Sequence, residues 1–300
     1  MSQALPSVII GGPTASGKTA IALAVAEACG GEIIGADAFQ LYQGLPILTA
    51  QPAPEELQKI PHHLIGEFNL QETLDVTRYL DVARAKIRQV REAGRVPILV
   101  GGTGLYIRSI LFGLADGLPS PNTSLRAELE AQPLPSLQTQ LQALDPVAYT
   151  QVDLLNPRRV IRALEVCIQT GRPFSSFKHN TSWNQPPIGI WLTRDRSELH
   201  QRIELRTKQM IEHGAVDEVR EALPKIGPTA GQVIGLRPIE AYLEGRSSLG
   251  QTLEAIALST RQYAKRQETW FRKETALRSV PPEQALDLAL SIIESQLPPP

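Results

Sequence analysis

The stretch Gly12-Pro13-Thr14-Ala15-Ser16-Gly17-Lys18-Thr19 matches the phosphate-loop pattern G-x-x-x-x-G-K-[ST] at every specified position. Its glycines let the backbone wrap around a phosphate, so that successive N–H groups and the start of the next helix point at the anion. The Lys18 ammonium adds a positive charge, and the Thr19 hydroxyl suits Mg²⁺. We predict a diphosphate or triphosphate site, with Thr19 as a metal ligand, formed by Gly12, Thr14, Ala15, Ser16, Gly17, Lys18 and Thr19.

The sequence around this loop alternates between strand and helix signals. Short apolar runs are typical of buried strands, and Ala-rich or amphipathic stretches of helices; they occur at 7–10, 32–35 and 96–100 for strands and at 20–29 and 77–92 for helices. This alternation predicts an α/β fold with a parallel sheet flanked by helices. Ligands gather at the carboxyl ends of such strands, so we expect the turns at 11–19, 35–40 and 101–106 to converge.

The length of the chain, 300 residues, exceeds what one hydrophobic core usually serves. Near residue 115 the composition changes to a Gln- and Leu-rich segment that prolines interrupt, and strand signals return only at 188–192. We therefore predict a core of residues 1–114 plus 188–300, with a mostly helical domain inserted at 115–187. Beyond residue 195 the core reads as mainly helical.

The composition excludes several classes of protein. The chain is 42% hydrophobic and 20% charged, which is ordinary for a soluble globular protein. No basic leader precedes the first apolar run, and no apolar stretch is long enough to span a membrane, so we expect a cytoplasmic protein with no membrane partner. Two cysteines, Cys29 and Cys167, exclude a Cys-only zinc site.

The net charge of −1 hides an uneven distribution of charge. Residues 158–208 carry six more basic than acidic side chains, and residues 261–278 carry four more. Such segments indicate either a surface that binds a polyanion or ordinary solvated helix faces.

Two further positions bear on chemistry. Asp37 follows the second predicted strand, where it suits a Mg²⁺ ligand, a general base or the cap of a following helix. Arg206 lies in register with an otherwise apolar helical stripe, so it needs an anionic partner, which is either a phosphate or a structural carboxylate. No acid follows the strand at 96–100, where many P-loop NTPases place a metal-binding carboxylate, and this weakens an ordinary ATPase reading.

With these residues assembled, the chain resembles the tRNA dimethylallyltransferases (isopentenyl-tRNA transferases) over nearly its whole length. The stretches that carry the resemblance are GPTASGKT (12–19), DAFQLYQGLPILTAQP (37–52), PHHLI (61–65), VGGTGLY (100–106), NPRRVIRALEV (156–166), LHQRIELR (199–206) and TRQYAKRQETWFR (260–272). Several ordered motifs with similar spacing are far more specific than a phosphate loop alone.

The resemblance implies a P-loop-kinase-like core whose inserted helical domain grips the anticodon stem-loop of a tRNA. The implied reaction moves a dimethylallyl group from dimethylallyl diphosphate to the exocyclic N6 amine of the adenosine directly 3′ of the anticodon. It also implies a need for Mg²⁺ and a diphosphate, in place of ATP, in the loop at 12–19. A monomer is expected.

Roles for single residues follow from the same resemblance. Asp37 becomes the general base, and Arg206 and Thr103 join it as catalytic residues, with Lys18 and Thr19 also on the leaving diphosphate. The implied tRNA contacts are Asp37, Ala38, Phe39, Gln40, Thr103, Arg126, Arg158, Arg159, Val160, Ile161, Arg162, Arg237, Lys265, Arg266, Gln267 and Trp270. For Trp270, a core anchor is the alternative to a surface on which a base stacks.

The chain departs from the family pattern at a few positions. Ala38 stands where the family usually has Ser, Leu48 where it has Gly and Gln51 where it has Lys; 235–238 also differs. These changes affect substrate fit and rate more than the class of reaction.

Two rival functions remain at the level of sequence. A P-loop kinase for a small metabolite explains the core but leaves the basic segments without a role. A nucleotide-binding RNA chaperone explains the basic segments but leaves Asp37 without one.

Overall fold

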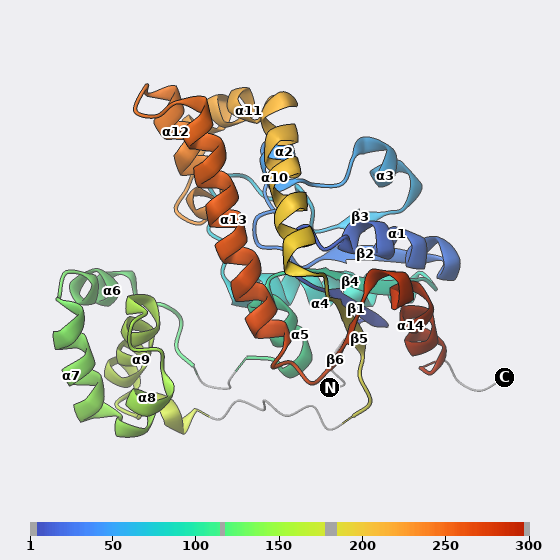
Figure 1. The fold of residues 1–300 in the computed structure, drawn as a ribbon. Coiled ribbons are helices and arrows are strands. Elements are labelled where there is room, and N and C mark those ends of the chain that lie inside the picture. Colours follow the sequence, from blue (N-terminus) through green and yellow to red (C-terminus); the bar gives the residue numbers. More distant parts are fainter. Residues whose placement is uncertain (1–4, 115–117, 178–184, 297–300) are drawn as a thin grey trace. The chain divides into compact units, whose positions relative to one another are not determined.

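The computed structural model describes residues 5–114, 118–177 and 185–296 (Figure 1). It consists of two compact units, each with its own core. The first unit holds Met1–Leu111 and Ser182–Pro300, and the second holds Phe112–Thr181. The sequence placed the borders of the inserted domain at 115 and 187.

The first unit is built on one parallel sheet. Its six strands are β1 (Val8–Gly11), β2 (Gly31–Gly35), β3 (His62–His63), β4 (Val96–Gly101), β5 (Gly189–Leu192) and β6 (Leu277–Val280). Their order is β3-β2-β4-β1-β5-β6, and every neighbouring pair is parallel, which confirms the predicted α/β sheet. The sequence missed β3, which is two residues long, and the edge strand β6, whose two central residues are exposed and polar.

Helices cover both faces of this sheet. They are α1 (Lys18–Cys29) and α14 (Pro282–Glu294) on one face and α4 (Val76–Glu92) and α5 (Gly104–Phe112) on the other. Alternate residues of β1 point to opposite faces. Accordingly, Val8 and Ile10 pack with α1 and α14. On the opposite face, Tyr79 of α4 stacks on Tyr106 of α5 with ring centroids 3.7 Å apart.

A further group of helices rises from the sheet in the same unit (Figure 1). It comprises α2 (Pro46–Thr49), α10 (Arg196–Glu212), α11 (Ala215–Ala222), α12 (Leu236–Leu243) and α13 (Leu249–Phe271), with α3 (Pro54–Lys59) and the short 3₁₀ turns η2 (Leu223–Lys225) and η3 (Ala230–Gln232) nearby in the chain. Helices α10 and α13 pack along each other, and α11 packs on α2 and α12. The predicted mainly helical segment after residue 195 is therefore confirmed, apart from β6.

The second unit is helical in its described residues, as the sequence predicted. Its elements are α6 (Thr123–Glu130), α7 (Leu134–Leu144), α8 (Pro146–Gln151), α9 (Pro157–Thr170) and the 3₁₀ turn η1 (Phe174–Ser176). A core of leucine, isoleucine, valine and alanine side chains joins these helices. Asn122, Asp145 and Asn156 each accept a hydrogen bond from a first-turn N–H. These caps explain why α6, α8 and α9 begin directly after them.

Membrane association through a spanning helix has no basis in the described part of the chain. None of its helices combines the length and the apolar character that crossing a bilayer requires.

Candidate active site

The phosphate loop joins β1 to α1, and two of its residues have positive φ angles. Gly17, directly before α1, has a φ of 99°, and Ala15 has a φ of 63°, a left-handed conformation that residues other than glycine seldom adopt. Two arginines hold this shape by donating to loop carbonyls. Arg194 Nε lies 2.8 Å from Ser16 O, and Arg202 Nε lies 2.8 Å from Ala15 O. Arg194 lies just before α10, and Arg202 lies in the second turn of that helix.

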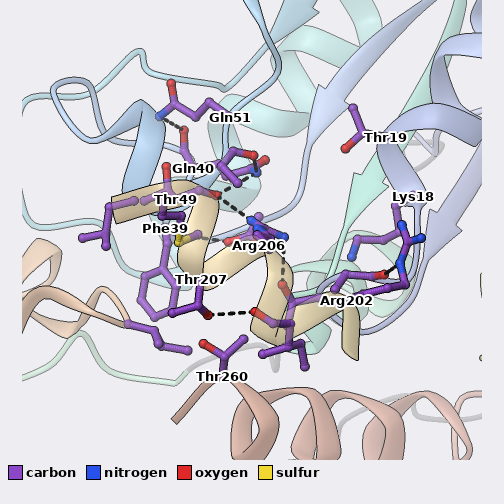
Figure 2. Close-up of a pocket in the computed structure, with 18 of the residues that line it drawn as sticks. Lys18, Thr19, Phe39, Gln40, Thr49, Gln51, Arg202, Arg206, Thr207 and Thr260 are labelled. Carbon is purple, nitrogen blue, oxygen red and sulfur yellow. Dashed lines mark hydrogen bonds between the residues drawn. The ribbon is translucent and has the colours of Figure 1, made fainter. Parts of the chain in front are cut away.

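The three turns that the sequence expected to converge do meet. Thr103 N donates to Ala36 O at 3.1 Å, and Thr103 Oγ1 accepts from Ala38 N at 2.9 Å, so the turn after β4 is tied to the turn after β2. The phosphate loop, Asp37 and Gly101 line the same pocket of about 510 Å³. Residues of α2, α10 and α13 complete the wall (Figure 2).

Asp37 lies in the wall of this pocket and does not cap a helix. Its Oδ1 accepts from Phe39 N at 3.0 Å, and residues 38–41 form turns. The helix-cap alternative is therefore wrong. The general base and the metal ligand remain as roles for a carboxylate beside a phosphate loop.

Arg206 reaches across the pocket from α10 to the phosphate loop. Its Nη1 donates to Thr14 Oγ1 at 3.2 Å and its Nη2 to Thr49 O at 3.5 Å, while its buried Nε has no partner (Figure 2). Burial lowers the pKa of Arg206 below its usual range, and the charge of Asp37 opposes that shift. No Asp or Glu of the described residues forms an ion pair with this guanidinium. The structure thus favours a bound anion over a structural carboxylate as its partner.

Lys18 is held over the same loop. Its Nζ donates to Pro13 O at 2.8 Å. Burial lowers the pKa of Lys18 from 10.5 to about 8, and the nearby Arg206 charge adds to the shift, whereas Asp37 opposes it. With a pKa of about 8, the Lys18 amine is mostly protonated at neutral pH and loses its charge as the pH rises above 8.

This lowered pKa predicts a pH dependence for anion binding. A diphosphate binds the charged form of Lys18, so above pH 8 binding must take up a proton, and the affinity for inorganic diphosphate should fall by up to about tenfold per pH unit. Calorimetric titration across pH 7 to 10 measures this slope. The Lys18→Arg variant stays charged over the range and controls for the titration of diphosphate itself. Equal slopes for the two proteins would contradict the prediction.

Gln267 has a different place from the one that the sequence implied. Its side chain is buried, its Oε1 accepts from Thr14 N at 2.8 Å, and its Nε2 donates to Gly102 O at 2.9 Å. A Cβ at Gly102 would come within 2.1 Å of that Nε2, so a glycine is required there. Gln267 therefore ties the phosphate loop to the turn after β4, and its side chain is buried.

Truncating Gln267 should destabilise the core. The Gln267→Ala variant leaves Thr14 N and Gly102 O without partners, so we expect the free energy of unfolding to fall by about 1–3 kcal/mol. Urea unfolding measures the change. Gln262→Ala, an exposed position on the same helix, serves as the control and should change the stability little. Equal stability of both variants would show that the two backbone groups find other partners.

Two other residues assigned to tRNA contact have buried side chains. Val160 and Ile161 of α9 lie in the core of the second unit, with 0% and 4% of their surface exposed, because helical periodicity turns their side chains inward. The neighbouring Arg158 and Arg159 are exposed on the other side of the helix. The correction follows from α9 being amphipathic.

Arg126 and Arg162, beside the core of the second unit, share a structural partner that sequence analysis missed. Buried Glu165 accepts from Arg126 Nη2 and from Arg162 Nη1, each at 2.7 Å, and from Asn122 N at 2.7 Å. These bonds hold the pKa of Glu165 below its usual range despite burial. A lone Glu on an apolar helix face is the sequence signal that points to such a pairing.

The remaining predicted residues lie in the first unit. Trp270 packs over Gly104 and meets Phe271 edge-on at 4.9 Å between ring centroids, as expected of a core anchor. Gln40 donates from Nε2 to Thr49 O at 3.1 Å and to Ala50 O at 2.7 Å. Three other predicted tRNA contacts are exposed. Lys265 and Arg266 lie on α13, and Arg237 lies on α12, where it pairs with Glu240.

The pocket offers donors that fit a magnesium ion carried mainly by a diphosphate. Thr19 and Asp37 both line it, and Mg²⁺ usually takes one or two protein oxygens together with phosphate oxygens and water. Within the described ranges, no three His, Cys, Asp or Glu side chains gather into a site that would hold a metal without the substrate.

Comparison with known proteins decides the family. The family model described as IPP transferase matches residues 40–274, most of the chain. This chain belongs to the IPP transferase family. A tRNA dimethylallyltransferase of Caulobacter sp. (strain K31) is 40% identical to it over 285 residues, covering 89% of this chain and 90% of the relative. One from Geobacter metallireducens is 40% identical over 296 residues, covering 95% and 96%.

Solved structures of IPP transferases share the fold. The tRNA isopentenylpyrophosphate transferase from Bacillus halodurans superposes with a TM-score of 0.69 at 33% identity, covering 96% of both chains. A eukaryotic dimethylallyltransferase acting on tRNA superposes with a TM-score of 0.77 at 26% identity, covering 96% of this chain and 77% of the other. The resemblance read from the sequence motifs is thereby confirmed.

Proposed function

We propose that this IPP transferase moves a dimethylallyl group from dimethylallyl diphosphate to the N6 amine of the adenosine directly 3′ of a tRNA anticodon, releasing diphosphate. The observation that carries the proposal is Arg206, a buried guanidinium with no carboxylate partner that faces the phosphate loop beside Asp37. The similarity to tRNA dimethylallyltransferases supports the choice of tRNA and dimethylallyl diphosphate as substrates.

The chemistry is a displacement at the allylic carbon. The adenosine nitrogen forms a bond to the carbon that bears the diphosphate, the carbon–oxygen bond breaks, and diphosphate leaves with the bonding electrons. The amine loses a proton to the Asp37 carboxylate, and a base in this position typically contributes about 10²–10⁴-fold. Thr103, whose Oγ1 accepts from Ala38 N, holds the turn that carries Asp37.

The leaving diphosphate gains negative charge in the transition state. Lys18, Arg206 and the N–H groups of the phosphate loop are fixed around the place where this charge develops, so they need little reorganisation. Thr19 would hold Mg²⁺ on the diphosphate, where the ion neutralises part of its charge. The apolar part of the pocket wall, which includes Leu48, Ile203 and Ile256, suits the dimethylallyl group.

The acceptor base must leave its stack to reach the pocket. Unstacking costs a few kcal/mol, and least where the base is already single-stranded, as in an anticodon loop. Phosphate attraction by the basic helices offsets part of this cost. We also propose that the protein acts as a monomer in the cytoplasm. Its two cysteines, Cys29 and Cys167, are free thiols, which agrees with a reducing compartment.

Transfer of label tests the reaction directly. We expect unmodified tRNA, Mg²⁺ and radiolabelled dimethylallyl diphosphate to yield label on N6 of the adenosine next to the anticodon, as nucleoside analysis reports. The expected product excludes both rivals. Phosphorylation of a small acceptor by ATP, without transfer of label, would instead establish the kinase, and tight tRNA binding without any product would establish the chaperone.

Arg158 and Arg159 provide a test of the inserted domain. Their replacement by Gln together should weaken tRNA binding and reduce the slope of log affinity against log salt by about 1 to 2, because up to two phosphate contacts are lost. The matched control is Arg88→Gln with Arg91→Gln, two exposed positions on α4 that make the same change in net charge. An unchanged slope would assign the second unit a structural role.

A further inference from the structure

Helix α2 forms part of the pocket wall and is held at its C-terminal end by the site itself. Leu48 and Thr49 line the pocket. The carbonyl of Thr49 accepts from Arg206 Nη2 at 3.5 Å and from Gln40 Nε2 at 3.1 Å (Figure 2). The position of α2 therefore sets where the Arg206 guanidinium is anchored on this side of the pocket.

The N-terminal end of α2 is held by Glu218 of α11. Glu218 Oε1 accepts from Ile47 N at 2.7 Å, and Oε2 accepts from Leu48 N at 2.8 Å. These are first-turn amides with no partner inside the helix, and Pro46 before them has no N–H to offer. One carboxylate thus satisfies both donors.

Burying the Glu218 carboxylate at this contact costs desolvation energy. Burial raises the pKa of Glu218, and the two N–H donors counteract only part of that shift. No Lys or Arg of the described residues forms an ion pair with this carboxylate. A four-residue helix cannot persist by its own hydrogen bonds, so α2 depends on contacts from outside.

We infer that Glu218 is a positioning residue of the transferase site: by fixing α2, it places the Thr49 carbonyl that orients the Arg206 guanidinium toward the diphosphate. The inference rests on the proposed function for the identity of the anion. Glu218 touches neither the phosphate loop nor Asp37 through any hydrogen bond in the structure, so its effect passes through α2.

The test compares Glu218→Gln with Asp217→Asn. Asp217 is the preceding residue, exposed and paired with Arg220, so its variant controls for loss of a charge on α11. The glutamine keeps the shape but presents an amide that cannot accept from both N–H groups. We expect Glu218→Gln to weaken binding of inorganic diphosphate about tenfold and to raise the KM for dimethylallyl diphosphate similarly, as for loss of one hydrogen bond to a charged group. The control should bind as the unmodified protein does.

A double-mutant cycle separates positioning from mere stability. If Glu218 acts through Arg206, Glu218→Gln should weaken diphosphate binding about tenfold in the unmodified protein but by less than about twofold when Arg206→Gln is already present. Additive losses, or faster hydrogen exchange at residues 46–51 with unchanged affinity, would overturn the inference. Should Glu218→Gln fail to fold, Glu218→Asp, one methylene shorter, enters the same cycle with the same two outcomes.

The result of the double-mutant cycle does not depend on the proposed reaction. Binding of inorganic diphosphate is measured without tRNA and without turnover. Absence of transfer by the unmodified protein would therefore refute the proposed function alone, whereas additivity in the cycle would refute only the role of Glu218.

Discussion

We expect Asp37→Asn to lower the rate of dimethylallyl transfer by about 10²–10⁴-fold, the range for removal of a general base. The amide cannot accept the proton that the adenosine amine must lose. Its Oδ1 can still accept from Phe39 N, as the Asp37 Oδ1 does at 3.0 Å, so the turn should keep its shape. Single-turnover measurement with saturating tRNA reports the chemical step.

The design separates a base from a binding group. Affinities for tRNA and for inorganic diphosphate should stay close to those of the unmodified protein. Asp75→Asn is the matched control, because Asp75 caps α4 by accepting from Arg78 N and Asn caps a helix equally well. Transfer by Asp37→Asn at the full rate would remove Asp37 from the mechanism. If Asp37→Asn instead weakens diphosphate binding when Mg²⁺ is present but not when it is absent, Asp37 is a ligand of the metal.

The second large effect concerns Arg206. Arg206→Gln should lower kcat/KM for dimethylallyl diphosphate by about 10²–10³-fold, since a donor aimed at the developing charge of the leaving group is lost. It should also weaken binding of inorganic diphosphate. Lys208→Gln, an exposed position on the same helix, removes the same charge and should leave diphosphate binding unchanged.

The same variant should not lose stability. The Arg206 guanidinium is desolvated, its Nε has no partner, and the charge of Asp37 offsets only part of the burial cost, so removing the guanidinium relieves a cost in the folded state. We expect the Tm of Arg206→Gln to equal or exceed that of the unmodified protein in the absence of diphosphate. A lower Tm together with unimpaired transfer would show that Arg206 serves the fold and not the reaction.

The central part of the site could be predicted from sequence because it is local. The phosphate loop, Asp37 and the turn at 101–104 each follow closely on a strand, and short apolar runs reveal those strands. Parallel strands bring such turns to one edge, so convergence follows from the order of the elements. The helical character of the second unit was equally local, because it depends on apolar spacing and on caps.

Sequence could not tell buried from exposed side chains where a family motif runs through a helix that has two faces. The motif at 156–166 places Val160 and Ile161 beside Arg158 and Arg159, but helical periodicity buries the first pair and exposes the second. Gln267 lies in a basic segment, yet its own helix turn points its amide at the phosphate loop. A motif indicates which segment matters and leaves open which side chains face the ligand.

The sequence by itself determined the family, the parallel sheet and the phosphate loop with Asp37 beside it, since each follows from short motifs or apolar runs and from their order along the chain. Tertiary structure alone decided that Arg206 lacks a carboxylate partner, that Gln267 joins two turns and that Glu218 holds α2. The bonds concerned join residues far apart in the chain: 253 positions for Gln267 and Thr14, and 171 for Glu218 and Ile47. Only the packing of α13 beside the phosphate loop and of α11 on α2 brings these partners within hydrogen-bond distance.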